Sequence, residues 1–276
     1  MTEQKNWFIT GTSRGFGREW ALAALERGDR VAGTARDTAT LQDIVERFGD
    51  AFLPIELDVT DRAAGFAAVQ RAHEAFGRLD VVVNNAGYGQ FGMAEELSEH
   101  ELRAQIETNV FGAIWITQAA LPILRSQGAG HILQVSSIGG VSAFANLSAY
   151  HASKWALEGF SQALAQEVAE FGVHVTLIEP GGFSTDWSGP SAKHATPLPA
   201  YDAARERRAQ QRAQQSAAGA GDPAASARAL LEVVDAAEPP LRVFFGTRPI
   251  EIAKADYASR IATWDTWQRV AELAQG

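Results

Sequence analysis

The sequence contains no cysteine, which excludes a disulfide framework, a thiolate nucleophile and a cysteine-ligated metal. Its six histidines do not follow the HExxH spacing, so we expect no metal site. Basic residues are also in short supply, with 24 Lys and Arg against 33 Asp and Glu. The resulting net charge of −9 argues against nucleic acid or an anionic membrane as a partner.

Long hydrophobic runs are missing as well. No apolar stretch approaches the ~18 residues that a membrane-spanning helix needs. The first ten residues, MTEQKNWFIT, pass from a polar opening directly into a predicted strand, without the apolar segment of a signal peptide. We therefore expect a cytoplasmic protein with no membrane partner.

The 276 residues, 46% of them apolar, alternate between predicted strands and predicted helices. This alternation predicts an α/β fold with one doubly wound parallel sheet of about seven strands and helices on both faces, forming a single domain over 1–276. The expected helix starts include Thr60 as an N-cap and a capping box of Ser98 with Glu101. The predicted strands are 6–10, 30–36, 51–57, 79–83, 131–136, 173–179 and 241–245, and the helices are 18–27, 38–48, 61–76, 104–127, 149–171, 223–235 and 250–273.

Unusual residues follow five of the predicted strands. They are Gly11–Gly17, Asp58, Asn84–Gly87, Ser137 and Pro180–Thr185. In a doubly wound sheet, ligands bind beyond the carboxyl ends of the strands. These segments are therefore expected on one rim of the sheet.

Tyr150 and Lys154 lie four residues apart at the start of a predicted helix, so their side chains share one helix face. An ammonium group near a phenol favours the phenolate and is expected to bring the phenol pKa down from about 10. With the hydroxyl of Ser137, this set suits proton transfer to or from a carbonyl oxygen. Ordinary packing of a tyrosine near a helix start explains the pair about equally well when it is taken alone.

The loop Gly11–Gly17 stands between a strand and a helix, where glycines let the backbone approach a pyrophosphate. A tight structural turn explains this spacing nearly as well. Residues 11–15 also fit GxSxG, the nucleophile elbow of α/β-hydrolases. That fold needs several strands before the elbow, and only one precedes residue 11, so we set the hydrolase interpretation aside.

Taken together, TGTSRGFG (10–17), NNAG (84–87), Asn109, Ser137, YHASK (150–154) and PGGFST (180–185) resemble the short-chain dehydrogenase/reductase family. The resemblance covers residues 5–185 with full motifs, and IEPGGFSTDW (178–187) looks like its 17β-hydroxysteroid-dehydrogenase-like branch. It implies a Rossmann fold, a nicotinamide dinucleotide across the rim and homodimer or homotetramer contacts through helices 104–127 and 149–171.

The resemblance also assigns roles to individual residues. Tyr150 becomes the proton donor and acceptor, and Lys154 binds the nicotinamide ribose and lowers the tyrosine pKa. Ser137 holds the substrate oxygen, and Asn109 anchors a water in the proton relay. The implied cofactor-binding residues are Gly11, Ser13, Arg14, Gly15, Phe16, Gly17, Arg36, Asp58, Val59, Asn85, Ala86, Gly87, Tyr150, Lys154, Pro180, Gly181 and Thr185. Within this set Asp58 and Val59 would contact adenine, and Thr185 the carboxamide.

The choice between NAD and NADP depends on charge at the end of the second strand. An acid there binds a free ribose 2′-OH, whereas arginine accommodates a 2′-phosphate. Ala35 stands where NAD-preferring relatives carry Asp, Arg36 follows it, and Arg14 lies in the glycine loop. We expect Asp37 to face solvent, and we predict NADP(H).

The sequence thus predicts an NADP(H)-dependent oxidoreductase that interconverts a ketone or aldehyde with an alcohol. The alternative is a dinucleotide-binding sensor without turnover. Phe91, Phe144, Phe183 and Trp187 indicate an apolar substrate, or ordinary packing. Residues 183–221 are expected to form a lid, and the charged run 205–212 a solvated helix face.

Overall fold

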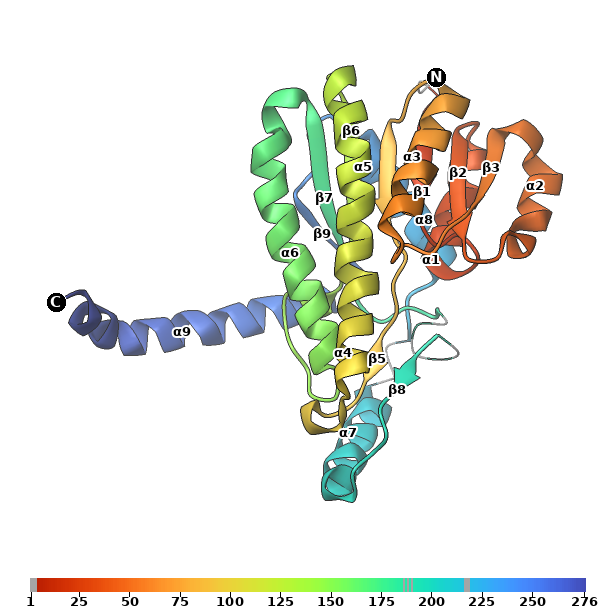
Figure 1. Cartoon of the computed structure of the whole chain (residues 1–276). Coiled ribbons are helices and arrows are strands. Elements are labelled where there is room, and N and C mark those ends of the chain that lie inside the picture. The colour runs from red at the N-terminus through yellow and green to blue at the C-terminus, as the bar shows by residue number, and fades with distance from the viewer. Residues whose placement is uncertain (1–3, 186, 188, 190, 216–218) are drawn as a thin grey trace.

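The computed structural model describes residues 4–185, 187, 189, 191–215 and 219–276. Its centre is a parallel sheet of seven strands in the order β3-β2-β1-β4-β6-β7-β9 (Figure 1). The strands are β1 (Asn6–Ile9), β2 (Arg30–Ala35), β3 (Phe52–Glu56), β4 (Val81–Asn84), β6 (Gly130–Val135), β7 (Val173–Pro180) and β9 (Arg242–Phe245). The chain order reverses between β1 and β4, which is where ligands bind in such sheets.

Helices cover both faces of this sheet, as predicted. One layer holds α1 (Gly15–Glu26), α2 (Gln42–Phe48) and α8 (Pro223–Asp235), and the other holds α3 (Arg62–Phe76), α5 (Gly112–Gln127) and α6 (Ser148–Val168). Successive side chains of a strand point to opposite faces. Trp7 and Ile9 therefore join the core under α1, while Phe8 between them joins the core under α3 and α5.

Several helix starts differ from the predicted ones. Asp61, and not Thr60, caps α3, because its side chain accepts from the backbone N–H of Ala64 at 3.0 Å. The hydroxyl of Thr60 instead donates to Asp58 at 2.8 Å. The capping box of Ser98 is confirmed, and it opens α4 (Glu99–Ile106), which continues through a π-helical turn, Glu107–Phe111, into α5. The predicted helix 38–48 is a 3₁₀ turn (Thr38–Leu41) followed by α2.

Two short strands were not predicted from the sequence. β5 (Gln90–Phe91) pairs in parallel with β8 (Lys193–His194), and α7 (Asp202–Gln215) follows below them in Figure 1. The prediction of a solvated face for 205–212 is wrong at Arg205, which hydrogen bonds to the buried carboxylate of Glu96 and, at 2.6 Å, to Asp202. Glu206 and Arg207 are exposed, as predicted.

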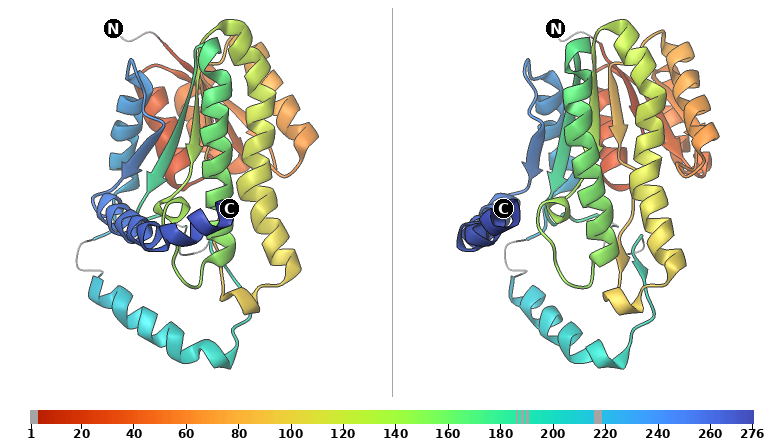
Figure 2. Two further views of the ribbon diagram at one scale, coloured as in Figure 1. Left: turned by 90° about the vertical axis from the view of Figure 1, so that its left-hand side faces the viewer. Right: turned by 60° about the vertical axis from the view of Figure 1, so that its left-hand side comes forward.

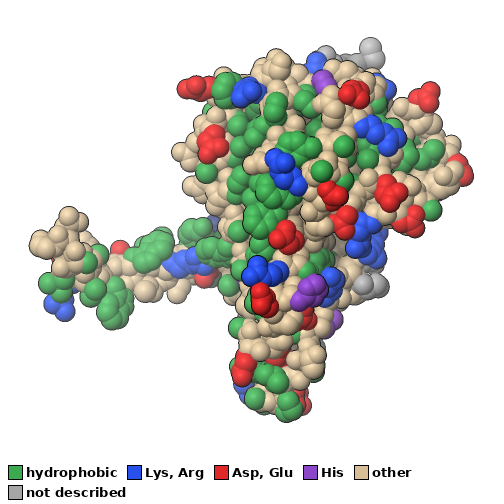
Figure 3. All heavy atoms as spheres, in the orientation of Figure 1, with side chains coloured by type: hydrophobic (Ala, Val, Ile, Leu, Met, Phe, Trp, Pro, Cys, Tyr) green, Lys and Arg blue, Asp and Glu red, His purple; other side chains and the backbone are tan. Residues whose placement is uncertain are grey.

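A long C-terminal helix, α9 (Pro249–Gln275), extends away from the body (Figures 1 and 2). Its first turns pack on the 3₁₀ turn Ile138–Gly140, where Ala253 joins Ile138 and Val141 in a small apolar cluster. From Ile261 onward every residue is exposed. Figure 3 shows hydrophobic side chains along this protruding helix.

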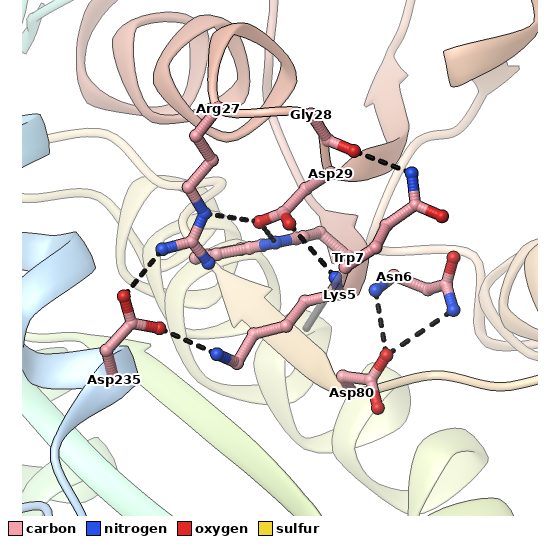
Figure 4. Close-up of polar contacts among 9 residues, drawn as sticks. Lys5, Asn6, Trp7, Arg27, Gly28, Asp29, Asp80 and Asp235 are labelled. Carbon is pink, nitrogen blue, oxygen red and sulfur yellow. Dashed lines mark hydrogen bonds and ion pairs between the residues drawn. The ribbon is translucent and has the colours of Figure 1, made fainter. Parts of the chain in front are cut away.

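A buried carboxylate connects the chain segments at the amino ends of β1 and β2 (Figure 4). Asp29, 3% exposed, accepts hydrogen bonds from Trp7 Nε1 at 2.8 Å, from the backbone N–H of Lys5 at 2.9 Å and from Arg27 Nε at 2.6 Å. Arg27 and Lys5 also reach Asp235 at the end of α8. This network joins β1, α1, β2 and α8 on the side of the molecule opposite the predicted site.

Within the described residues, no helix combines the length and the apolar character needed to cross a membrane. The same residues contain no group of three or more His, Asp or Glu side chains that could hold a metal ion.

Candidate active site

A cleft of about 630 Å³ opens at the carboxyl ends of the strands. Both the glycine loop and the Ser137–Tyr150–Lys154 set border it. Of the predicted cofactor-binding residues, the structure places these on its walls: Gly11, Ser13, Arg14, Gly15, Phe16, Arg36, Asp58, Val59, Asn85, Ala86, Gly87, Tyr150, Lys154, Pro180, Gly181 and Thr185. Gly17 and Asn109 are not among the lining residues.

The glycine loop leaves the N-terminus of α1 facing the cleft without a side-chain cap. Gly11 and Gly15 have φ angles of +73° and +57°, which side chains disfavour. No described side chain caps the first N–H groups of α1, so these donors and the positive end of the helix dipole are free for an anion. This backbone therefore fits a pyrophosphate.

Gly17 does not line the cleft; it packs against Gly11 and Asn85 on the other side of the loop. A Cβ at this position would lie 2.4 Å from both the carbonyl oxygen of Gly11 and Nδ2 of Asn85. Asn85 Nδ2 in turn donates to the carbonyl oxygens of Thr10 and Gly11, at 2.9 and 3.0 Å. The second asparagine of the NNAG motif thus holds the glycine loop in place by hydrogen bonds.

The ends of β2 and β3 form the far wall. Arg36 is exposed at the cleft, whereas Asp37 turns away, because its side chain accepts from the backbone N–H of Ala39 at 2.9 Å and starts the next 3₁₀ turn. The prediction for Asp37 is confirmed. Asp58 lines the cleft, and its Oδ1 accepts from Thr60, so the carboxylate also fixes its own turn.

Tyr150 comes from the first turn of α6, and its side chain is buried at the base of the cleft. Burial raises its pKa to about 12, against a hydrogen bond with Ser137 that lowers it. Ser137 is the second residue after β6, and its Oγ accepts from the backbone N–H of Gly139 at 3.0 Å. Because Oγ accepts this bond, the serine's own proton faces Tyr150 and can turn from there to a substrate oxygen.

Lys154 lies one turn further along α6 and is also buried. Its Nζ donates to the carbonyl oxygen of Val135 at 2.7 Å and lies 5.7 Å from the centroid of the Tyr150 ring. Burial lowers the lysine pKa to about 8, while the charge of Glu158 raises it. The predicted lowering of the tyrosine pKa by Lys154 is therefore wrong for the protein alone, because burial penalises phenolate and ammonium together.

Asn109 lies in the π-helical turn and points into the protein. Its amide accepts from the backbone N–H of Tyr88 at 3.1 Å and donates to the carbonyl oxygen of the same residue at 3.0 Å. It also donates to Ser153 Oγ at 3.1 Å, and Ser153 donates to the carbonyl oxygen of Tyr150. Asn109 thus ties the loop after β4 to the helix that carries Tyr150, a geometry for which π-turns are often used.

The remaining walls include residues that the sequence did not single out. Tyr88 follows the NNAG motif directly, and Lys193 Nζ lies 4.4 Å from the centroid of its ring. Lys193 belongs to β8, over a hundred residues away, and no sequence signal marks it. The Trp187 ring packs at a tilt against Tyr150, with ring centroids 4.9 Å apart and an interplanar angle of 58°. Phe91 lies behind both and does not line the cleft.

The sequence model of the short chain dehydrogenase family matches residues 5–196. The chain therefore belongs to the short-chain dehydrogenase/reductase family, and it is an oxidoreductase. It is 42% identical to oxidoreductase BOA17 of Botryotinia fuckeliana over 97% of this chain and 98% of that protein. A crystal structure of a short-chain dehydrogenase from Streptomyces avermitilis superposes with a TM-score of 0.89, at 39% identity, over 99% and 98% of the two chains. The NADPH-dependent 3-dehydrocapnine reductase of Ornithobacterium rhinotracheale is 34% identical over 68% of this chain and 69% of that protein.

Proposed function

We propose that this protein interconverts a ketone or aldehyde with an alcohol, using NADP(H). Two observations support this proposal. Ser137, Tyr150 and Lys154 lie together at the base of the cleft, and the N-terminus of α1, which has no side-chain cap, lies at its rim. The first arrangement suits proton transfer at a carbonyl oxygen, and the second suits a dinucleotide phosphate.

The residues present fit such a cofactor. The N–H groups of Gly15, Phe16 and Gly17 would hold its pyrophosphate, and Asp58 and Val59 would flank its adenine. When bound, the nicotinamide supplies or accepts the hydride. Tyr150 gives its proton to the substrate oxygen during reduction, and the Ser137 hydroxyl donates a second hydrogen bond to that oxygen. Such preorganised donors are worth about 10²–10³ in rate.

The preference for NADP is supported by charge at the far wall. Arg36 is exposed where it lines the cleft, and Arg14 lines the same cleft. No acid reaches into the cleft from the end of β2, because Asp37 is engaged in its cap. The dependence of the 3-dehydrocapnine reductase relative on NADPH agrees with this proposal.

The test is the ratio of kcat/KM with NADPH to that with NADH. We expect the ratio to exceed 10 and to fall at least tenfold in Arg36→Ala, since one lost charge-assisted contact corresponds to about 1.5–3 kcal/mol. Arg71→Ala, which removes an exposed arginine on α3, is the matched control. Equal efficiency with the two cofactors contradicts the NADP assignment but leaves the reaction class intact.

For the substrate, we propose a bulky apolar carbonyl compound or secondary alcohol. Phe144, Leu147, Phe183 and Trp187 line the cleft, and Leu147 and Trp187 pack against Tyr150. Because IEPGGFSTDW (178–187) looks like the 17β-hydroxysteroid-dehydrogenase-like branch, steroids are the first class to assay, with aryl ketones, quinones and retinoids beside them. NADPH consumption across this panel also separates an enzyme from the alternative, a silent dinucleotide-binding sensor.

The assembly that we propose is a homodimer or homotetramer. Apart from Leu198, the large exposed hydrophobic residues described outside α9 lie on α4, on the π-helical turn before α5, on α6 or in the turn after α6: Leu102, Phe111, Trp155 and Phe171. Together with α9 they leave apolar surface that association would cover. Sedimentation measures the state directly, and a monomer at micromolar concentration contradicts it.

Two predictions concern the rest of the chain. We propose that residues 183–221 act as a lid within the single domain, although 186, 188, 190 and 216–218 lie outside the described residues. The pair of β5 with β8 and the contact of Arg205 with Glu96 anchor the described part of this segment to the body. The cytoplasm stays the predicted location.

A further inference from the structure

Two glutamates lie buried directly behind the candidate active site. Glu158 on α6 is 6% exposed and Glu179 on β7 is 1% exposed. One guanidinium faces both carboxylates: Arg242 Nε on β9 donates to Glu158 Oε2 at 3.0 Å and lies 3.4 Å from Glu179 Oε1. The cluster thus has two acids for one base, and two buried carboxylates this close to one cation disfavour double ionisation.

Unsatisfied oxygens show where the extra proton belongs. Glu158 Oε1 and Glu179 Oε1 are both buried and make no hydrogen bond of full geometry within the described residues; the hydroxyl of Ser136, also unpaired, is the neutral neighbour of Glu158. A single proton between the two carboxyl groups satisfies both oxygens, because a protonated carboxyl donates where an ionised one accepts. Burial and the charge of Glu158 raise the pKa of Glu179 to about 8, so this proton resides on Glu179 at neutral pH. Burial raises the pKa of Glu158 as well, but Ser136 and Arg242 oppose this effect, so we assign the charge to Glu158, next to Arg242.

Glu158 stands one helical turn after Lys154, on the same face of α6. Its charge opposes the effect of burial on the lysine and raises the lysine pKa. The space around it is closed by Gly140, where a Cβ would lie 2.6 Å from Ser136 Oγ and 3.0 Å from Glu158 Cγ. Ser136 also lines the cleft, so the cluster lies one residue behind the Ser137 wall.

We propose that Glu158, kept ionised by Arg242 and by the proton on Glu179, is a positioning residue that holds Lys154 in its ammonium form and so sets the alkaline limit of carbonyl reduction. The charged groups that act on this cluster from the neighbouring elements are Arg242 on β9, Glu179 on β7 and Lys154 on α6 itself. The inference rests on the proposed function, since it concerns the pH range of that reaction.

The test is the pH dependence of kcat/KM for NADPH-dependent reduction, which reports groups of the free enzyme. Glu158→Gln keeps the shape and removes the charge. We expect its alkaline limb to move down by about one pH unit. Glu179→Gln removes the second carboxyl group but leaves the charge of Glu158. The alkaline limb of this variant should therefore stay in place or move to higher pH. Gln162→Ala, which loses a contact to Arg242 without any titrating group, is the matched control.

If Glu158 had a purely structural role, the alkaline limb would stay in place in both variants, or would move in the same direction in both. An unmoved limb in Glu158→Gln therefore overturns the proposal, as does a downward shift in Glu179→Gln equal to that of Glu158→Gln. Should Glu158→Gln not fold, Glu158→Asp draws the charge back by one methylene and should move the limb in the same direction by less.

Thermal unfolding supplies a readout without catalysis. Glu179 is protonated in the folded chain and ionised in the unfolded chain between about pH 4.5 and 8, so folding binds a proton there. The Tm contribution of this group falls as pH rises through that range, and Glu179→Gln should flatten the curve. A wild-type protein that reduces no carbonyl refutes the proposed function, whereas an identical Tm curve in Glu179→Gln refutes the shared proton.

Discussion

The ammonium of Lys154 donates to the carbonyl oxygen of Val135, 2.7 Å away, on the strand that leads to Ser137. Lys154 therefore fixes the strand end as well as carrying charge. We expect Lys154→Met to lower kcat/KM by about 10²–10⁴ and to cost about 1–3 kcal/mol of stability, because the Val135 oxygen loses its donor. Lys254→Met, at an exposed position of α9, should change neither quantity. Near-normal turnover in Lys154→Met would remove Lys154 from the site.

Tyr150→Phe isolates the hydroxyl from the ring. The ring keeps its contact with Trp187, so binding of NADPH should stay within about a factor of 3, while kcat falls by at least about 10³. Fluorescence titration and steady-state kinetics measure the two effects separately. Tyr257→Phe, a half-exposed tyrosine on α9, controls for general effects of the substitution. Retained turnover in Tyr150→Phe refutes the assigned proton donor.

Asp29 offers a prediction for stability alone. Its buried carboxylate accepts three hydrogen bonds, two of them from Trp7 and Arg27. Asp29→Ala leaves these donors without a partner and should cost about 3–5 kcal/mol. Urea unfolding measures the loss, and Asp265→Ala on the exposed part of α9 is the control. A loss below about 1 kcal/mol contradicts the role given to this network.

His131 is expected to lower the stability of the protein at acidic pH. Burial, helped by the positive charges of His174 and Lys5, lowers its pKa to about 3, whereas the unfolded chain binds the proton near pH 6.5. The stability is therefore fully present above pH 6.5 and is lost as pH falls toward 3, by up to about 1.4 kcal/mol per pH unit. His131→Gln should flatten this decline in Tm, and the exposed His100→Gln should not. Equal acid curves for wild type and His131→Gln would contradict this account.

The sequence predicts the sheet well because apolar residues dominate each strand, and turn or cap residues separate the strands from the helices. The motifs at the strand ends also fall on one rim for a topological reason, since all strands are parallel. Helix starts are less certain. Thr60 and Asp61 are both good caps, and only the backbone path decides that Asp61 accepts from Ala64.

Contacts between distant segments explain the remaining differences. The pair of Gln90–Phe91 with Lys193–His194 joins two-residue strands that carry no periodicity. The contacts of Arg205 with Glu96 and of Arg242 with Glu158 are likewise set by tertiary packing, not by spacing along the chain. The direction of the Tyr150 pKa was missed for a similar reason, because burial depends on everything packed around the ring.

The protruding α9 gives the protein its own optical probe. Trp264 and Trp267 are 62% and 63% exposed, whereas Trp7 and Trp20 are fully enclosed. Iodide should quench the first two and spare the second two. Any association that covers α9 then reads out as protection from the quencher and a blue-shifted emission, without a label and at the concentrations used for kinetics.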